Sequence, residues 1–180
     1  MSDNSRYAHI EGRRDIVFDV NAKSILGKID AVVFDLDGTL TDSIGQILSC
    51  THTTFEYLSL PQPDDKAIMS TIGLELGEAL TSLLPEDKKH LGPSVTKDYR
   101  EIFKSRRDLQ LDTLFLGIEP LMKKLRELDI KIGYASGRSM HGIERTMNAT
   151  FLGKYCDGIC AGSEVPSKPD PTMMHILCKR

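Results

Sequence analysis

The stretch VVFDLDGTLTDS, residues 32–43, limits what this chain can fold into more than any other part of the sequence. An apolar, β-branched run from Ala31 to Phe34 is followed at once by Asp35 and Asp37. Such a run is typical of a strand that a parallel sheet covers on both faces. Two carboxylates this close repel each other and resist desolvation, so they either stay in water on a turn or share a site with a cation.

Beyond this stretch, helix and strand patterns alternate along the chain. In order, they predict a helix over 119–128, a strand over 130–135, a helix through Ile143, Met147 and Phe151, a strand-like segment over 155–162 and a short helix from Pro171. Strands that alternate with helices are typical of βαβ units. The sequence therefore predicts an α/β fold whose core is a Rossmann-like parallel sheet with helices on both faces.

The segment between the first two predicted strands is too long for a simple crossover. It holds about 95 residues, whereas a crossover needs only a dozen or so. Residues 44–114 carry helical patterns and little strand character. We therefore expect an α-helical cap over 44–114, inserted into a core of 30–43 and 115–180, with hinges near 41–46 and 112–117.

The first 29 residues are expected to be an N-terminal extension outside this core. Within it, residues 1–10 are predicted to be a loose tail, and 15–20 either a short edge strand or unordered chain. No apolar region of a secretory signal appears there. The cysteines, Cys50, Cys156, Cys160 and Cys178, form no CxxC pair. Reduced thiols and a cytoplasmic location are the expectation.

Composition narrows the class of partner. The formal net charge is −3, the isoelectric point is about 6.0, and no run of Lys and Arg appears, so nucleic acid is not an expected partner. No apolar stretch approaches the roughly 18 residues that a membrane span needs.

Polar residues follow each predicted strand: Asp35 and Asp37 the first, Ser136 and Gly137 the second, and Lys168 the third. The carboxyl ends of parallel strands meet at one edge of a sheet, where ligands bind. Mg²⁺ takes oxygen ligands and leaves positions open to substrate phosphate, so it would let both carboxylates share one site. The sequence therefore predicts a magnesium-dependent phosphate site at this edge.

In such a site, Asp35 can attack phosphorus to form an acyl phosphate, and Asp37 can move the proton. The Ser136 hydroxyl, the Gly137 N–H at a helix start and the Lys168 ammonium suit the charge on the phosphoryl group. Each has a plainer interpretation: Ser136 and Gly137 as a helix cap, Lys168 as a solvated loop lysine. Arg138 either touches a substrate anion or is solvated.

Three motifs resemble those of the haloacid dehalogenase-like phosphohydrolases: FDLDGTLTDS, YASGRS and VPSKPDP. The segments GLELGEALTSLLP and LFLGIEPLMKKLRELDIKIGYASGRS resemble the phosphoglycolate phosphatase-type branch, which has a helical cap. The resemblance implies a magnesium-dependent phosphatase of small phosphorylated metabolites that works through an aspartyl phosphate. It also implies that the cap closes over the site, with the loop 72–78 selecting substrates.

The resemblance assigns roles to individual residues. Asp35 would be the nucleophile and Asp37 the acid/base, with the Asp35 carboxylate and the Asp37 carbonyl holding Mg²⁺. Thr39 would support the loop. Ser136 would bind phosphate, and Lys168 would stabilise the aspartyl phosphate.

One family motif is missing. The fourth motif, an acidic pair that supplies a further metal ligand, has no counterpart after Lys168, where the only acidic residue is Asp170 within the third motif. Asp64 and Asp65 are expected to be a solvated helix start in the cap instead. The sheet core is thus expected to be incomplete at its C-terminal end, with an edge through which two copies could pair.

Three interpretations remain open at this stage. The chain is a truncated form of a phosphatase, or a weakly active or inactive remnant that acts as a binding module, or a phosphosugar mutase using the same aspartyl chemistry. Phosphate release that Asp35→Asn abolishes would favour hydrolysis. Conversion of a sugar 1-phosphate to its 6-phosphate without release would favour the mutase.

Overall fold

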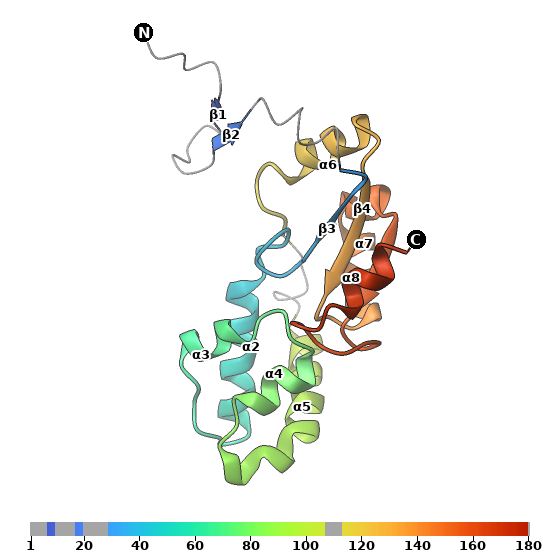
Figure 1. Cartoon of the computed structure of the whole chain (residues 1–180). Helices are drawn as coiled ribbons and strands as arrows, with labels where there is room; N and C mark the ends of the chain where they lie inside the picture. The colour runs from blue at the N-terminus through green and yellow to red at the C-terminus, as the bar shows by residue number, and fades with distance from the viewer. Residues whose placement is uncertain (1–6, 10–16, 20–28, 107–112, 180) are drawn as a thin grey trace.

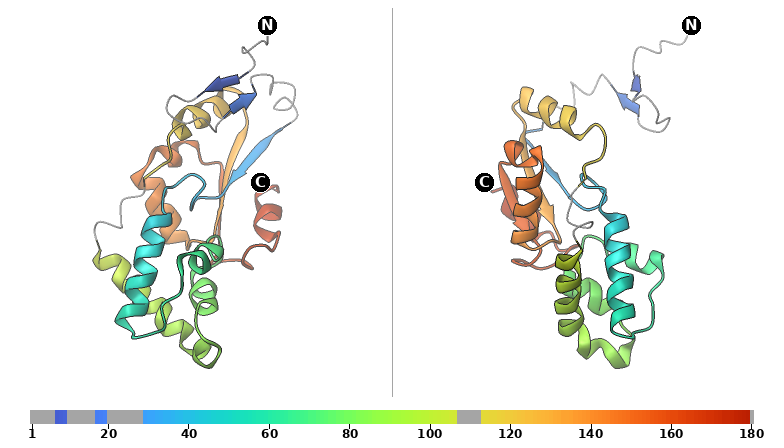
Figure 2. Two further views of the ribbon diagram at one scale, coloured as in Figure 1. Left: turned by 90° about the vertical axis from the view of Figure 1, so that its left-hand side faces the viewer. Right: turned by 180° about the vertical axis from the view of Figure 1, so that it is seen from behind.

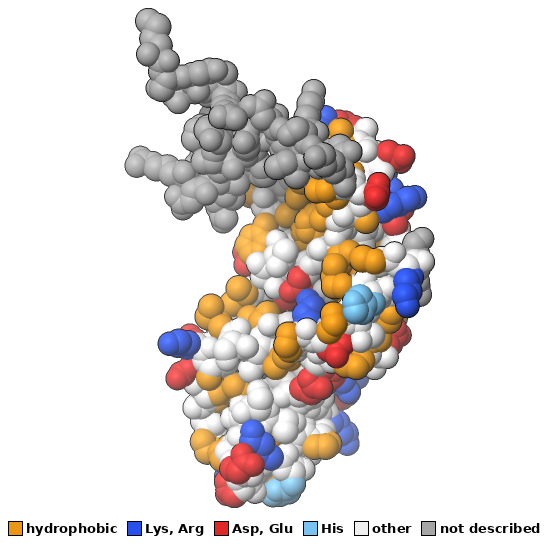
Figure 3. All heavy atoms as spheres, in the orientation of Figure 1, with side chains coloured by type: hydrophobic (Ala, Val, Ile, Leu, Met, Phe, Trp, Pro, Cys, Tyr) orange, Lys and Arg blue, Asp and Glu red, His pale blue; other side chains and the backbone are white. Residues whose placement is uncertain are grey.

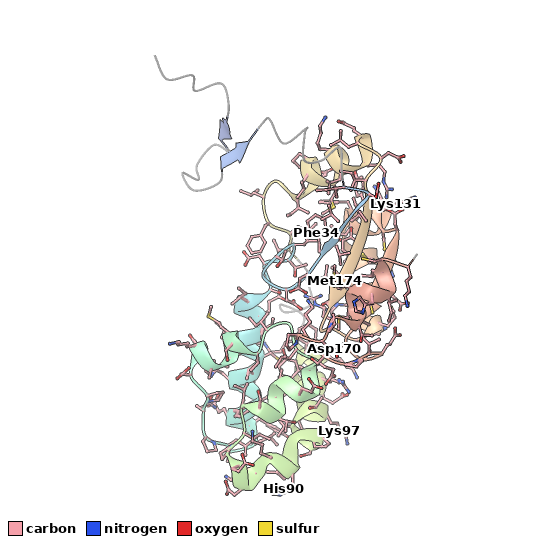
Figure 4. The ribbon with its side chains drawn as sticks, viewed as in Figure 1. Phe34, His90, Lys97, Lys131, Asp170 and Met174 are labelled. Carbon is pink, nitrogen blue, oxygen red and sulfur yellow. The ribbon has the colours of Figure 1, made fainter. Side chains whose placement is uncertain are left out.

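The computed structural model describes residues 7–9, 17–19, 29–106 and 113–179 (Figure 1). A parallel sheet with its flanking helices forms one end of the molecule, and a group of helices forms the other. Figure 4 marks the extent of this arrangement: Lys131 lies at the far end of the sheet, Asp170 near the junction, and His90 at the far end of the helical group.

The sheet has three parallel strands in the order β3-β4-β5: β3 (Ala31–Phe34), β4 (Lys131–Ser136) and β5 (Gly158–Ala161). Phe34 pairs with Tyr134, and Ser136 with Ala161, so all three strands end at the same edge. The predicted α/β fold with a parallel sheet is confirmed.

Only β4 is buried along nearly all its length, as a strand with a neighbour on each side should be. β3 is half-buried or exposed at every residue, because among the described residues it pairs with β4 alone. The prediction that the first strand is covered on both faces was therefore too strong. Its apolar sequence resembles that of a central strand, but its position is an edge.

Helices cover both faces of the sheet, as predicted. On one face, α6 (Ile118–Glu127) and α7 (Met140–Ala149) pack against β4, with Met122, Ile143 and Tyr134 fully buried between them. On the other face, α8 (Thr172–Leu177) packs through Met173. Figure 2 shows α8 on the opposite side of the sheet from α6 and α7.

The helix predicted through Phe151 is shorter than the sequence pattern suggested. α7 ends at Ala149, and Phe151 begins a separate 3-10 helix, η5 (Phe151–Tyr155). Thr150 causes the break: its backbone is extended, and its hydroxyl accepts a hydrogen bond from the Leu152 N–H. Thr is a favoured N-cap residue, and this local contact outweighs the four-residue apolar repeat.

Between β3 and β4 the chain is helical: α2 (Ile44–Tyr57), α3 (Asp65–Ser70), α4 (Leu76–Ser82), η3 (Glu86–Leu91) and α5 (Gly92–Ser105). We call these helices the cap. They enclose an apolar cluster of their own, centred on Phe55 and Leu80, which is separate from the core under the sheet.

The two connections to the cap run side by side. The Asp42 N–H donates to the Thr113 carbonyl at 2.8 Å, and the Phe115 N–H donates to the Leu40 carbonyl at 3.1 Å. The chain thus leaves and re-enters the sheet region at one place, which is the arrangement expected of a hinge.

The extension contains a short antiparallel pair, β1 (Tyr7–His9) and β2 (Val17–Asp19), with Ala8 opposite Phe18. The expected loose tail was wrong at Tyr7–His9, because these residues find a strand partner ten residues along the chain. The short strand anticipated within 15–20 is present as β2. The rest of the tail lies outside the described residues.

None of the helices in the described part of the chain has the length and apolar character of a membrane span. On the face shown in Figure 3, acidic and basic side chains are scattered, and neither sign forms a broad patch.

Candidate active site

The candidate site lies where the sheet meets the cap, at the carboxyl ends of the three strands. Asp35 and Asp37 follow β3, Ser136 ends β4, and Lys168 lies in the loop between β5 and α8. Asp170, labelled in Figure 4, marks the position of this last loop beside the cap.

Asp35 forms an ion pair with Lys168. The lysine Nζ lies 2.8 Å from Asp35 Oδ1 and donates a second hydrogen bond, 3.0 Å long, to the carbonyl of Ala135. Both charged side chains are about 30% exposed, at 27% and 31%, so a solute can reach the carboxylate. The Ala135 contact holds the ammonium at the end of β4 instead of leaving it in solvent.

Asp37 is more enclosed and has a different cationic partner. Arg138 Nε lies 3.1 Å from Asp37 Oδ1 and 3.0 Å from Oδ2, and Nη2 lies 2.6 Å from Oδ1. The Ser43 hydroxyl donates to Oδ1 as well. Burial by itself would raise the pKa of Asp37, but Arg138, through hydrogen bonding and charge, and Ser43 together outweigh it, so the pKa is lowered.

The loop that carries both aspartates is closed by Thr41 and not by Thr39. The Thr41 hydroxyl, fully buried, donates to the Leu36 carbonyl at 2.9 Å. Thr39 is exposed and contributes its backbone N–H to the same carbonyl at 3.1 Å. Gly38 makes the turn with a φ of 73°, which side chains other than glycine adopt at a cost. The support of this loop by Thr39 is thus seen in its backbone N–H, and any further function of its side chain stays a prediction.

Ser136 is fully buried and close to the Arg138 backbone, whose N–H donates to the Ser136 hydroxyl at 3.2 Å. Gly137 is not at a helix start as expected. Helix α7 begins at Met140, and Ser139 is its N-cap, accepting a hydrogen bond from the Gly142 N–H.

Gly137 instead lies directly beneath the cap. A Cβ atom there would overlap the carbonyl oxygen of Leu74 and lie 2.7 Å from that of Gly73. Only a residue without a side chain allows the two backbones to approach this closely. The cap loop around Leu74, part of the predicted selecting segment 72–78, therefore rests on the loop that follows β4.

A hydrogen bond fastens the same cap loop to the third motif. The Glu75 N–H donates to the Ser167 hydroxyl at 2.9 Å, and Ser167 immediately precedes Lys168. The Glu75 carboxylate also accepts from the Gly77 and Glu78 N–H groups and so caps α4. A groove of about 730 Å³ runs from Glu75 into the cap toward Arg100 and Lys89.

Two other acidic positions lie outside the site. Asp64 caps α3 by accepting from the Ala67 N–H, and Asp65 lies in its first turn, so the predicted helix start is confirmed. Asp170 accepts from the Thr172 N–H at 2.8 Å, at the beginning of α8, and is exposed.

Within the described residues, no group of three or more His, Cys, Asp or Glu side chains is close enough together to hold a metal ion. The site offers fewer ligands: the Asp35 carboxylate, which has one oxygen beyond the Lys168 contact, and the Asp37 backbone carbonyl. Mg²⁺ commonly uses one or two carboxylates and completes its shell with water and substrate phosphate. This donor set fits such an ion.

Three site residues were missed or left undecided by sequence reasoning. Ser43 and Thr41 lie in the quoted first motif, but nothing in a single sequence separates them from its other hydroxyl residues. For Arg138 the sequence left two interpretations open, a contact with a substrate anion or a solvated side chain. In the structure Arg138 forms an ion pair with Asp37 instead. Its side chain is only 14% exposed, so solvation was the wrong alternative.

A family model described as haloacid dehalogenase-like hydrolase matches residues 32–180. The probable phosphatase IndB of Dickeya dadantii is 29% identical over 143 residues, which cover 78% of this chain and 61% of IndB. A phosphoglycolate phosphatase of Chromobacterium violaceum is 27% identical over 161 residues, 85% of this chain and 71% of that protein.

Among solved structures, a haloacid dehalogenase-like hydrolase from Bacteroides fragilis matches with a TM-score of 0.71 and 25% identity, over 84% of this chain and 72% of that one. The present chain therefore spans about three-fifths to three-quarters of the proteins it resembles here.

Proposed function

This chain belongs to the haloacid dehalogenase-like hydrolase family, and we propose on that basis that it acts as a phosphatase of small phosphorylated metabolites through an aspartyl-phosphate intermediate. The observation that carries the proposal is the pairing of the two aspartates with different cations. Asp35 is paired with Lys168 and accessible, whereas Asp37 is enclosed by Arg138 and Ser43. Two neighbouring carboxylates in unlike environments suit two unlike roles.

In the first step, an Asp35 carboxylate oxygen attacks phosphorus and the bond from phosphorus to the ester oxygen breaks. The leaving alkoxide takes a proton from Asp37. The pKa of this carboxyl is lowered in the chain alone, and the negative charge of the approaching phosphate raises it so that Asp37 is protonated at this point. Lys168, 2.8 Å from the Asp35 carboxylate, offsets the negative charge that gathers as the carboxylate and the phosphoryl group approach. The products are an aspartyl phosphate on Asp35 and a free alcohol.

In the second step, water attacks the phosphorus of the aspartyl phosphate. Asp37, now ionised, takes the proton from that water, and the bond between the Asp35 oxygen and phosphorus breaks. Inorganic phosphate leaves, Asp35 is again a carboxylate, and Asp37 is again protonated. The Ser136 hydroxyl, buried at the end of β4, is our candidate for a phosphate contact in both steps.

The proposal includes Mg²⁺, which the Asp35 carboxylate and the Asp37 carbonyl would hold. When bound, the ion supplies positive charge that lowers the repulsion between the phosphate and the two aspartates. Removal of divalent ions by EDTA should therefore abolish turnover, and added Mg²⁺ should restore it.

A phosphorylated small acid is the first substrate class to test, since one relative is named phosphoglycolate phosphatase. The groove within the cap carries Glu75 and Glu78 as well as Arg100 and Lys89, and Arg100 lies 3.8 Å from Glu75, so its charges do not by themselves favour an anionic leaving group. We propose that the cap loop at Leu74 and Glu75 selects the substrate.

A second candidate function is binding of phosphate esters with little or no turnover. It is favoured by the small number of side-chain metal ligands among the described residues. Phosphate release from a panel of small phosphate esters, with and without Mg²⁺, separates the two. Release that Asp35→Asn abolishes supports the phosphatase, while saturable binding of the same esters without release supports the binding function.

Two further expectations stay predictions. Pairing of two copies through a sheet edge is consistent with β3, which contacts only β4 among the described strands of its sheet. Sedimentation at several concentrations, with Ala31→Lys at the exposed residue of that strand to block pairing, tests it. A cytoplasmic location, expected from four cysteines that form no disulfide in the described part of the chain, also stays a prediction.

A further inference from the structure

The two carboxylate oxygens of Asp37 accept different numbers of hydrogen bonds. Oδ1 accepts from Arg138 Nη2 at 2.6 Å, from Arg138 Nε at 3.1 Å and from the Ser43 hydroxyl. Oδ2 accepts only one of these contacts, from Arg138 Nε at 3.0 Å. A carboxylate oxygen has about two lone-pair sites, so Oδ2 is the oxygen with capacity for a further partner.

The Arg138 guanidinium group also contacts α7, on the side away from Asp37. Its Nη1 donates to the Thr146 hydroxyl at 2.6 Å, and Thr146 is fully buried in α7. The Thr146 hydroxyl in turn donates to the Gly142 carbonyl at 3.2 Å, one turn earlier in the same helix. The Arg138 backbone N–H is tied to Ser136. The guanidinium group is therefore anchored to α7 at one end and to the Asp37 carboxylate at the other.

A planar guanidinium that contacts a carboxylate through two nitrogens fixes the plane of that carboxylate, which a lysine ammonium cannot do. Both side chains are about 14% exposed, so water competes weakly for these contacts. Ser43 meets the carboxylate as a second donor, from the loop before α2. Rotation of the Asp37 carboxylate is opposed by all these donors together.

We propose that Arg138, braced by Thr146, is the positioning residue that orients Asp37 so that its Oδ2 exchanges the proton with the reacting group. Thr146 acts on Asp37 through Arg138. This inference rests on the proposed acid/base function of Asp37. It differs from the two alternatives left open by the sequence, because it requires Arg138 to act on the enzyme's own carboxylate.

The test uses two substrates that differ in their need for a proton. The leaving group of p-nitrophenyl phosphate departs without protonation, whereas that of phosphoglycolate is an alkoxide that must be protonated. Misplacement of a proton donor by an ångström or so costs up to about 100-fold in rate. In a single turnover, Arg138→Lys and Thr146→Val should therefore slow release of the alcohol from phosphoglycolate about 10- to 100-fold, with the half-saturating ester concentration changed by less than about 2-fold, and slow release of p-nitrophenol far less. Single-turnover rates are compared because Asp37 is the base of the second step for both esters, so a steady-state kcat would fall on both.

Thr146→Ser keeps the hydroxyl and is the matched control: it should retain near-normal kcat on both esters. Asp37→Asn should show the same dependence of the single-turnover rate on leaving group as Arg138→Lys, only larger. Melting temperatures of all variants separate a loss of folding from a loss of positioning.

Four outcomes would overturn the inference. A raised KM with unchanged kcat in Arg138→Lys would make Arg138 a substrate-binding residue. Equal losses of the single-turnover rate on both esters, or no loss of that rate in Thr146→Val, would leave it a structural ion pair. No turnover of either ester by the unaltered chain would overturn the proposed function itself, and the inference with it.

Discussion

Lys168 and Asp35 are 133 residues apart in the sequence, and the lysine Nζ lies 2.8 Å from the Asp35 carboxylate. The contact joins the end of β3 to the loop after β5, on either side of the central strand. Register between parallel strands places their ends together, so the proximity follows from the fold and not from local sequence. The pair is the point from which the proposed chemistry starts.

Gly137→Ala should impair the closed position of the cap. The added Cβ would overlap the Leu74 carbonyl, and neither backbone can yield without moving the cap loop. We expect kcat/KM to fall about 5- to 150-fold, since crowding of this kind costs about 1–3 kcal/mol. Gly45→Ala is the control, because a Cβ there meets nothing within 4 Å. Equal kinetic constants for the two variants would show that the cap loop does not need this close approach.

Thr41→Val should destabilise the protein, whereas Thr39→Val should not. The Thr41 hydroxyl is buried and donates to the Leu36 carbonyl, and loss of such a hydrogen bond costs about 0.5–1.5 kcal/mol. Thr39 is exposed, and substitutions at such positions usually change stability by less than about 0.5 kcal/mol. Urea unfolding of both variants measures the difference. A larger loss of unfolding free energy in Thr39→Val than in Thr41→Val would show that the Thr39 side chain supports the loop.

The contact between α2 and α3 should make stability depend on pH. His52 Nε2 lies 2.7 Å from Asp65 Oδ1, and the hydrogen bond to Asp65, followed by the one to Gln62, raises the pKa of His52 above 6.5. The stabilisation is complete below the unfolded pKa of about 6.5 and is lost as pH rises through the higher folded value.

Asp65→Asn should remove this dependence. Since the pair is exposed, the difference between the two proteins should be less than about 1 kcal/mol, and it should shrink as pH rises from about 6 to 8. Urea unfolding at several pH values tests this. Parallel stability curves for the unaltered chain and Asp65→Asn would contradict it.

Much of the fold could be predicted because its signals are local. The apolar runs that became β3 and β4, and the helical spacing in α6, depend on neighbours only for burial. Thr150 shows where such reasoning stops: an apolar repeat every four residues continued through it, but a hydroxyl cap ended α7 there. The half-burial of β3 could not be predicted either, because the sequence of a strand does not determine which strands lie beside it in the sheet.

The candidate site likewise has residues that the sequence predicts and contacts that it does not. Its residues Asp35, Asp37 and Lys168 are recognisable from motifs at strand ends. The contact of Arg138 with Asp37 is not, because an arginine after a strand can point to solvent, to substrate or to a neighbouring carboxylate with equal ease. Thr146 is one hydroxyl among many on helices, and only its burial against Arg138 distinguishes it.

The central claim is that Asp35 itself receives the phosphoryl group. Asp37→Asn with p-nitrophenyl phosphate and Mg²⁺ should accumulate the intermediate, because the first step needs no proton donor there and the second lacks its base. After acid quenching, mass spectrometry of the peptide containing residue 35 should show one added phosphoryl group on Asp35. Asp35→Asn should show no added phosphoryl group and release no phosphate. A phosphoryl group on another residue, or continued phosphate release by Asp35→Asn, would contradict the account.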